Sequence, residues 1–317
     1  MASQLAFKSR IASTSALEKI FNAQEMIASS HIAKARTVAM EAKPYSDAIF
    51  DAVQALVAHT DDIRHPIVRK DEKNPRVAVL ALTADRGMAG AYTSSVIRET
   101  ESLLARLDQQ SRQPQLFVYG RRGVSYYRYR NRSIVKTWEG NSDRPGVDVA
   151  REISQALLET YMTPAAKGGV SELYIVFTEF INMVVQKVRV LRMLPLELIR
   201  PDQEQPEEAI DAPVPDDEHG HQGDDRYAAL YDFEPSPQEV LDAVLPKYIQ
   251  SRIHECLLTS AASETASRQN AMHTATDNAK GLIDDLTRKL NATRQAAITQ
   301  ELTEIVGSAD ALNKEEE

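Results

Sequence analysis

The chain has 317 residues, enough for one large domain or two ordinary ones, and its formal net charge of −9 argues against a general nucleic-acid-binding protein. Its single cysteine, Cys256, excludes an intrachain disulfide and a cysteine-based metal site, which fits a reducing compartment. No apolar run reaches the roughly 18 residues that a membrane-spanning helix needs. The serine-rich N-terminus leads directly into a helical pattern without an apolar signal region, so we expect it to be mature sequence.

Residues 8–43 contain neither glycine nor proline and therefore predict a long N-terminal helix, which Pro44 interrupts only briefly. Along this helix, residues recur at a three–four spacing that is typical of a coiled-coil seam: Leu17, Ile20, Gln24, Ile27 and His31. Because the stripe is narrow, we expect this helix to pair with one other helix.

A second long helix is predicted at the C-terminal end of the chain. Residues 291–306 consist mostly of strong helix formers, and Gly307 stands where a helix stop is expected. Between Leu258 and Leu282 the only large apolar residue is Met272. A helix this polar must bridge solvent, pair along a thin seam or sit inside another protein. The two long helices can pair only in the antiparallel sense, provided that the middle of the chain folds near one end.

The middle of the chain alternates between apolar strands and amphipathic helices. Strands are predicted at 76–83, 115–120, 133–138, 172–178 and 183–194, and helices at 93–107 and 147–161. This alternation indicates a mainly parallel sheet with Rossmann-like winding. The predicted fold class is therefore α/β with long terminal helices: an antiparallel coiled coil plus a Rossmann-like domain.

An acidic stretch separates the predicted sheet from the C-terminal helix. Residues 201–225 are rich in Asp, Glu and Pro and show no hydrophobic periodicity, which indicates a solvated linker. Ser236 is a plausible N-cap, followed by proline at N1 and Glu239 at N3. We expect four parts: a helix in 1–72, the α/β domain in 73–200, the acidic insert in 201–226 and a helix in 227–317.

Three stretches could carry chemistry, and each has a simpler interpretation. The loop 85–90 could cradle a phosphate, but it lacks a complete phosphate-binding glycine motif, so a structural turn is favoured. Residues 121–132 interleave five Arg with three Tyr, a mix that suits nucleic acid, although a basic surface helix facing an acidic partner is favoured in an acidic chain. His219 and His221 could bind a metal weakly, but they lie in the acidic stretch, where a solvated linker is favoured.

No catalytic set of Ser, His, Cys and Asp is suggested by the sequence, and neither a metal nor a cofactor is expected. Arg268, Arg294 and Gln295 are long hydrogen-bond donors on a polar helix, suited to contacts with carboxylates of a surrounding protein. The residues alone thus favour a non-enzymatic coupling or scaffold protein. A nucleotide-binding enzyme built on the α/β domain is the alternative.

The same residues carry a resemblance to a known family. The segments 263–278 and 293–306 together resemble the C-terminal helix of the gamma subunit of F-type ATP synthases. The segments 20–30 and 82–92 are similar to the same family, though more loosely. The insert around 203–224 resembles the extra loops of actinobacterial members, which suggests a bacterial protein of that type.

The resemblance implies a non-catalytic rotor in the central stalk of the synthase. It would couple proton-driven rotation of the c ring to ATP synthesis in a hexamer of alpha and beta subunits. The α/β domain would lie near the epsilon subunit and the c ring, on the cytoplasmic side of the cell membrane, peripheral to it. No nucleic acid is implied as a partner.

The resemblance also assigns roles to individual residues of this sequence. Five residues match family positions that contact the catch region of a beta subunit: Arg268, Arg294, Gln295, Thr299 and Glu301. Three residues of the N-terminal helix match the collar region: Asn22, Gln24 and Met26. Gln24 departs from the family pattern, which usually has Met there. The tip, residues 298–312, would sit in an apolar bearing.

Overall fold

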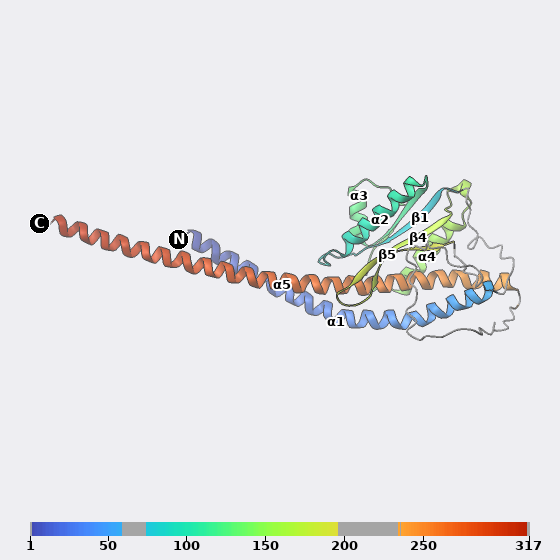
Figure 1. Ribbon diagram of the computed structural model, residues 1–317, viewed down its shortest axis with the longest axis horizontal. Coiled ribbons are helices and arrows are strands. Elements are labelled where there is room, and N and C mark those ends of the chain that lie inside the picture. Colours follow the sequence, from blue (N-terminus) through green and yellow to red (C-terminus); the bar gives the residue numbers. More distant parts are fainter. Residues whose placement is uncertain (1, 59–73, 196–233, 235, 316–317) are drawn as a thin grey trace, which may run out of the picture. The chain divides into compact units, whose positions relative to one another are not determined.

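The computed structural model describes residues 2–58, 74–195, 234 and 236–315. Its elements, in chain order, are α1 (Ala2–Ala58), β1 (Arg76–Leu82), α2 (Tyr92–Gln109), β2 (Gln113–Tyr119), α3 (Arg121–Tyr129), β3 (Lys136–Trp138), α4 (Val147–Met162), a short 3₁₀ turn (Ala165–Lys167), β4 (Glu172–Phe180), β5 (Gln186–Leu194) and α5 (Pro237–Glu315) (Figure 1). The chain divides into two compact units, Met1–Ser29 with Arg268–Glu317, and Ser30–Ser267. The four-part division expected from the sequence stays a prediction, and its acidic insert, with His219 and His221, lies outside the described residues.

The second unit is built on a five-stranded sheet in the order β3-β2-β1-β4-β5. Strands β1 to β4 run parallel, and β5 pairs with β4 in the antiparallel sense. In the register, Leu80 of β1 stands between Phe117 of β2 and Ile175 of β4. The predicted mainly parallel sheet is therefore confirmed, with the antiparallel strand at one edge.

Both faces of this sheet are covered, because side chains alternate along β1. Ala78, Leu80 and Leu82 belong to one core, which also includes residues of α4 and of the first part of α5. Val77 and Val79 belong to the other core, under α2 and α3. The two layers of helices are visible on either side of the strands in Figure 1. A buried strand with apolar residues on both faces explains why the sequence of β1 is almost wholly apolar.

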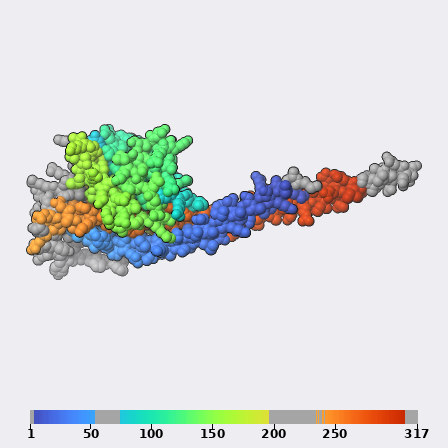
Figure 2. Space-filling view, turned by 180° about the vertical axis from the view of Figure 1, so that it is seen from behind, coloured from blue at the N-terminus to red at the C-terminus, as the bar shows by residue number. Residues whose placement is uncertain are grey.

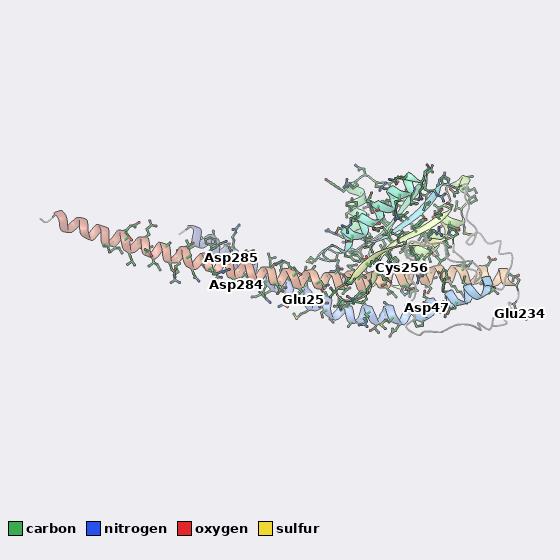
Figure 3. All side chains as sticks on the ribbon, in the orientation of Figure 1. Glu25, Asp47, Glu234, Cys256, Asp284 and Asp285 are labelled. Carbon is green, nitrogen blue, oxygen red and sulfur yellow. The ribbon has the colours of Figure 1, made fainter. Side chains whose placement is uncertain are left out.

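Helix α5 packs on the sheet through a stripe of apolar residues one turn apart. Leu245, Ile249, Ile253 and Leu257 are all fully buried and recur every four residues, so they lie on one helix face. Cys256, labelled in Figure 3, belongs to the same core, and burial raises the pKa of its thiol to about 12. Its thiol is thus a small core group and not a reactive nucleophile.

The ends of α5 show one confirmed prediction and one wrong one. The Glu239 backbone N–H donates to Ser236 Oγ at 3.3 Å, so the predicted N-cap is confirmed. The predicted stop at Gly307 is wrong, because α5 continues to Glu315. A glycine inside a helix costs only about 1 kcal/mol, which the helix formers on either side can offset. The helix also runs through Pro246 without a break.

The two terminal helices pack together in the antiparallel sense. In the first unit, Glu25 of α1 contacts His273 of α5 at 2.9 Å. In the second unit, Ser46 Oγ donates to Glu255 Oε2 at 2.8 Å, so positions on α5 decrease as those on α1 increase. Figure 2 shows the N-terminal part of α1 lying along the C-terminal part of α5. None of the described helices is apolar over a length that would cross a membrane.

The predicted seam of α1 is out of register by one residue at its three large apolar positions, whereas its two polar members, Gln24 and His31, are partly buried. Leu17, Ile20 and Ile27 are between 46% and 51% exposed, whereas Ala28 is 2% exposed. On α5, the buried residues of the first unit that lie beyond Arg268 are also mostly small or unbranched: Met272, Thr276, Ala279 and Leu286. Small residues let two helices approach closely, and Leu17, Ile20 and Ile27 are left on the outer surface of α1.

Candidate functional site

Two places could hold the function: the carboxyl edge of the sheet and the surface of the terminal helices. The chain leaves β1, crosses to β2 and β3 on one side, and returns to β4 on the other side of β1. In folds of this kind, ligands bind where the strand order reverses, outside the carboxyl ends of the strands. The loops after β1 and β4 are therefore the place to look for a nucleotide.

The loop after β1 is held as a structural turn around Asp85. One carboxylate oxygen of Asp85 accepts the backbone N–H of Arg121 at 2.9 Å. The other accepts the N–H groups of Gly140 at 3.0 Å and Ser142 at 2.9 Å. Three backbone donors from neighbouring segments thus bind this carboxylate and fix the start of the loop. The geometry supports the structural turn that the sequence favoured over a phosphate cradle.

The position between β1 and β4 is filled by side chains of the chain itself. Ser260 Oγ of α5 accepts the backbone N–H of Thr178 at 3.3 Å, and Ser263 Oγ donates to the carbonyl of Thr178 at 3.1 Å. Thr259 Oγ1 accepts the N–H of Phe180 at 3.2 Å. These hydroxyl groups bind the backbone at the end of β4, where a nucleotide would have to approach.

Two titratable groups are buried beside these hydroxyls. Burial raises the pKa of Tyr92, and the nearby carboxylate of Glu264 raises it further, while hydrogen bonds to Ser260 and Thr178 oppose the shift. Glu264 is 1% exposed. Sequence reasoning missed this polar cluster, since its members come from α2, β4 and α5 and only the fold brings them together. It closes the candidate nucleotide site. Within the part of the chain that is described, no group of His, Cys, Asp and Glu could hold a metal ion.

The segment of α5 from Asn291 to Val306 has the opposite character, because nearly every side chain in it is exposed. Only Thr293 and Ala297 are partly covered. The apolar members are Ile298, Leu302, Ile305 and Val306, which are between 47% and 63% exposed. In the first unit, α5 continues beyond the first residues of α1, as Figures 1 and 2 show. α1 therefore does not reach along the end of this segment.

Four of the predicted beta-catch residues lie on this exposed segment. Arg294, Gln295, Thr299 and Glu301 are all exposed. Thr299 Oγ1 donates to the backbone carbonyl of Gln295 at 3.0 Å, and the Gln295 side chain is exposed. A shallow hollow of about 390 Å³ runs along Thr299, Leu302, Thr303 and Val306. The segment thus offers both polar donors and apolar contacts.

Arg268, the fifth predicted contact residue, lies in a different environment. Its side chain is 8% exposed, and it interacts within the chain. Arg268 is therefore not an exposed donor of the kind that the sequence suggested, because a buried guanidinium must be compensated locally. The collar residues lie on α1, where Asn22 and Met26 are exposed and Gln24 is partly buried.

Sequence reasoning also missed an apolar turn between β4 and β5. Asn182 Oδ1 accepts the backbone N–H groups of Val184 at 2.9 Å and Val185 at 2.8 Å, which closes the turn. Ile181, Met183, Val184 and Val185 are all exposed there. The run of apolar residues around one Asn was a signal for this turn, but its second half, from Met183 to Val185, was included in the predicted strand.

Comparisons with known proteins identify the family of this chain. A family model described as ATP synthase matches residues 3–312. The ATP synthase gamma chain of Bifidobacterium adolescentis is 76% identical over 317 residues, with 100% of both chains covered. That of Beutenbergia cavernae is 50% identical over 309 residues, with 98% of both chains covered.

Solved structures show the same fold at low identity. A chain of the Euglena gracilis mitochondrial ATP synthase (OSCP/F1/c-ring) matches with a TM-score of 0.65 and 15% identity, covering 100% of this chain and 96% of that one. A chain of the Tetrahymena thermophila central stalk and c ring gives 0.53 and 17%, covering 81% and 99%. From the family model and the full-length relatives, this chain belongs to the ATP synthase gamma chain family, the non-catalytic central-stalk subunits of the F1 sector.

Proposed function

We propose that this chain is the rotating shaft that couples proton-driven rotation of a c ring to ATP synthesis in a hexamer of alpha and beta subunits. ATP hydrolysis would turn it in the opposite direction. The observation that carries the proposal is the exposed segment 291–306 of α5. A single helix that exposes Leu302, Ile305 and Val306 needs a surrounding protein to cover them.

A shaft of this kind works because it is asymmetric while its three partners are equivalent. Each catalytic site meets a different side of the shaft, so each is biased toward a different conformation. Rotation then moves every site in turn through binding, synthesis and release. Deep interlocking side chains would oppose each step, whereas the single exposed helix at the tip offers a shallow surface. Most of the small side chains of residues 259–267 are buried within the chain and do not contribute to that surface.

The exposure of each residue decides the role that we assign to it. We assign the beta-subunit catch to Arg294, Gln295, Thr299 and Glu301, whose exposure leaves them free for a partner. Arg268 belongs to the same set by position but contributes through its surroundings, since it is buried. Asn22, Gln24 and Met26 are assigned to the collar. The α/β domain would contact the epsilon subunit and the c ring, which makes the protein peripheral to the cell membrane on its cytoplasmic side.

The experiment measures coupled turnover in membrane vesicles that contain the assembled complex. Arg294→Ala with Gln295→Ala should reduce ATP synthesis and ATP-driven proton pumping on the order of tenfold, because one or two hydrogen bonds to the partner are lost. The matched control is Thr287→Ala with Arg288→Ala, two exposed residues on the same helix outside the segment. Equal turnover in both double variants would remove the catch assignment.

A further inference from the structure

The stretch from Gly120 to Trp138 carries five Arg and one Lys without any Asp or Glu, in a chain of net charge −9. Its second half forms what we call the basic cluster: Arg128, Arg130, Arg132 and Lys136. The cluster spans the end of α3 and the edge strand β3. A hollow of about 260 Å³ lies between the two elements, lined by Arg128, Arg132, Ile134, Val135, Lys136 and Thr137.

Most of this positive charge is not neutralised by the described part of the chain. Arg132 pairs with Glu101 at 3.1 Å. Arg130 instead lies over the ring of Tyr126 at 5.6 Å, and Lys136 over the ring of Trp138 at 5.4 Å. Among the described residues, neither these two cations nor Arg128 has a carboxylate partner. Cation–π contacts hold the side chains in place while leaving their charge available.

We propose that the basic cluster binds the acidic segment 202–225 of this same chain. That segment, which lies outside the described residues, contains ten Asp and Glu and no Lys or Arg. It is the strongest negative stretch in the sequence, as 120–138 is the strongest positive one. Charge complementarity therefore selects it as the occupant.

The sheet topology also favours this occupant. Strands β1 to β4 are parallel, so α3, which leaves the carboxyl end of β2, returns to the amino edge of the sheet at Arg128–Arg132. β5 is antiparallel and ends at that same edge, where Leu194 pairs with Leu173. The chain toward the acidic segment thus departs from the edge where the basic cluster lies.

The distance is short enough for the chain to cover. Four strand spacings of about 4.8 Å separate β5 from β3, and seven residues from Pro195 to Asp202 reach up to roughly 23 Å. Tethering raises the local concentration of the acidic segment to the millimolar range, so even weak exposed ion pairs are populated. A free polyanion such as nucleic acid would first have to displace it.

The test couples carboxylates to amines in the full-length chain with a zero-length carbodiimide and maps the products by mass spectrometry. Lys136 is the amine of the basic cluster, and we expect it to couple to Asp or Glu within 202–225. Lys289 and Asp285, 2.7 Å apart, provide an internal standard for the chemistry. Mixing isotope-labelled with unlabelled chain separates coupling within one molecule from coupling between two.

Charge reversal tests whether the cluster is the cause. Arg128→Glu with Arg130→Glu should lower the yield from Lys136 to the segment about fivefold, the loss expected for two exposed pairs. Arg98→Glu with Arg151→Glu, exposed positions on α2 and α4, should leave it unchanged. The proposal would be overturned if Lys136 coupled to a second copy or to another subunit of the assembled complex. It would also be overturned if the yield to the segment stayed unchanged in the reversed variant, or if added nucleic acid displaced the segment.

Discussion

Glu25 Oε1 lies 2.9 Å from Nδ1 of His273, so residues 248 positions apart in the sequence meet in one contact. The His273 side chain is 64% exposed and that of Glu25 is 23% exposed. A polar contact this accessible contributes about 0–1 kcal/mol even when both groups are charged, since water screens it. The contact therefore marks the register of the two helices more than it stabilises their pairing.

The seam beside this contact should matter more. Ala28→Leu adds three carbons at a 2% exposed position and is expected to cost about 1–3 kcal/mol by overpacking. Glu25→Gln, the matched change at the contact, is expected to cost less than 1 kcal/mol. Thermal unfolding followed by circular dichroism compares them. A larger loss for Glu25→Gln would show that the pair, and not the small-residue seam, holds the helices together.

Replacing each of two glycines by alanine should change the free energy of unfolding in opposite directions. Gly281 lies within α5, and an added Cβ would meet nothing within 4 Å, so Gly281→Ala should stabilise the chain by about 0.5–1 kcal/mol. Gly120 has φ +97°, and its Cβ would stand 2.2 Å from the carbonyl oxygen of Thr83. Gly120→Ala should therefore destabilise by more than about 2 kcal/mol. Denaturant titrations of both variants measure this, and a stable Gly120→Ala chain would contradict the described turn.

The sequence predicted the elements of this fold better than their contacts. Strand and helix periodicity located β1, β2, β4, α2 and α4 to within a few residues, because apolar patterning is a local signal. The seam of α1 was misplaced by one position since large apolar residues were expected inside. Ala28 is buried instead, and the partner helix is itself built of small residues there.

The environments of the candidate site residues were also only partly predictable from the sequence. Exposure of Arg294 and Gln295 fits their long polar side chains on a helix segment rich in Gln, Thr and charged residues, so it could be predicted from composition. Arg268 looks the same in the sequence, yet it is buried, because its environment depends on contacts made by the fold. The cluster of Tyr92, Thr178 and Ser260 joins three elements and has no sequence signature at all.

His254 should make the chain sensitive to mild acid. Partial burial lowers its pKa from the usual 6.5, so the folded chain resists a proton that the unfolded chain accepts. Stability from the neutral form is present above about pH 6.5 and is lost as pH falls toward the folded pKa. His254→Gln removes this titration. Its unfolding free energy should fall less between pH 7 and pH 5 than that of the parent chain, and parallel curves in urea titrations would contradict the assignment.

The exposed tip offers a test that separates folding from coupling. Leu302 is 58% exposed and Ile305 is 63% exposed, so replacing both by Ser removes little burial within the chain. The unfolding free energy of the isolated chain should change by less than about 0.5 kcal/mol for each substitution, as for most surface changes. In the assembled complex the same side chains would lie in the apolar bearing. There, replacing each apolar side chain by a polar one would remove about 1.5–3 kcal/mol of the stabilisation that its burial provides.

We therefore expect Leu302→Ser with Ile305→Ser to leave the isolated chain as stable as the parent and to weaken its retention in the complex. Thr274→Ser with Thr287→Ser, exposed positions on the same helix outside the tip and the catch, removes two methyl groups without adding polarity and is the control. Co-purification of the alpha and beta subunits and ATP turnover in vesicles measure the effect. Loss of stability in the isolated chain would mean that the tip packs within this chain. Unchanged turnover in the complex would mean that no bearing encloses it.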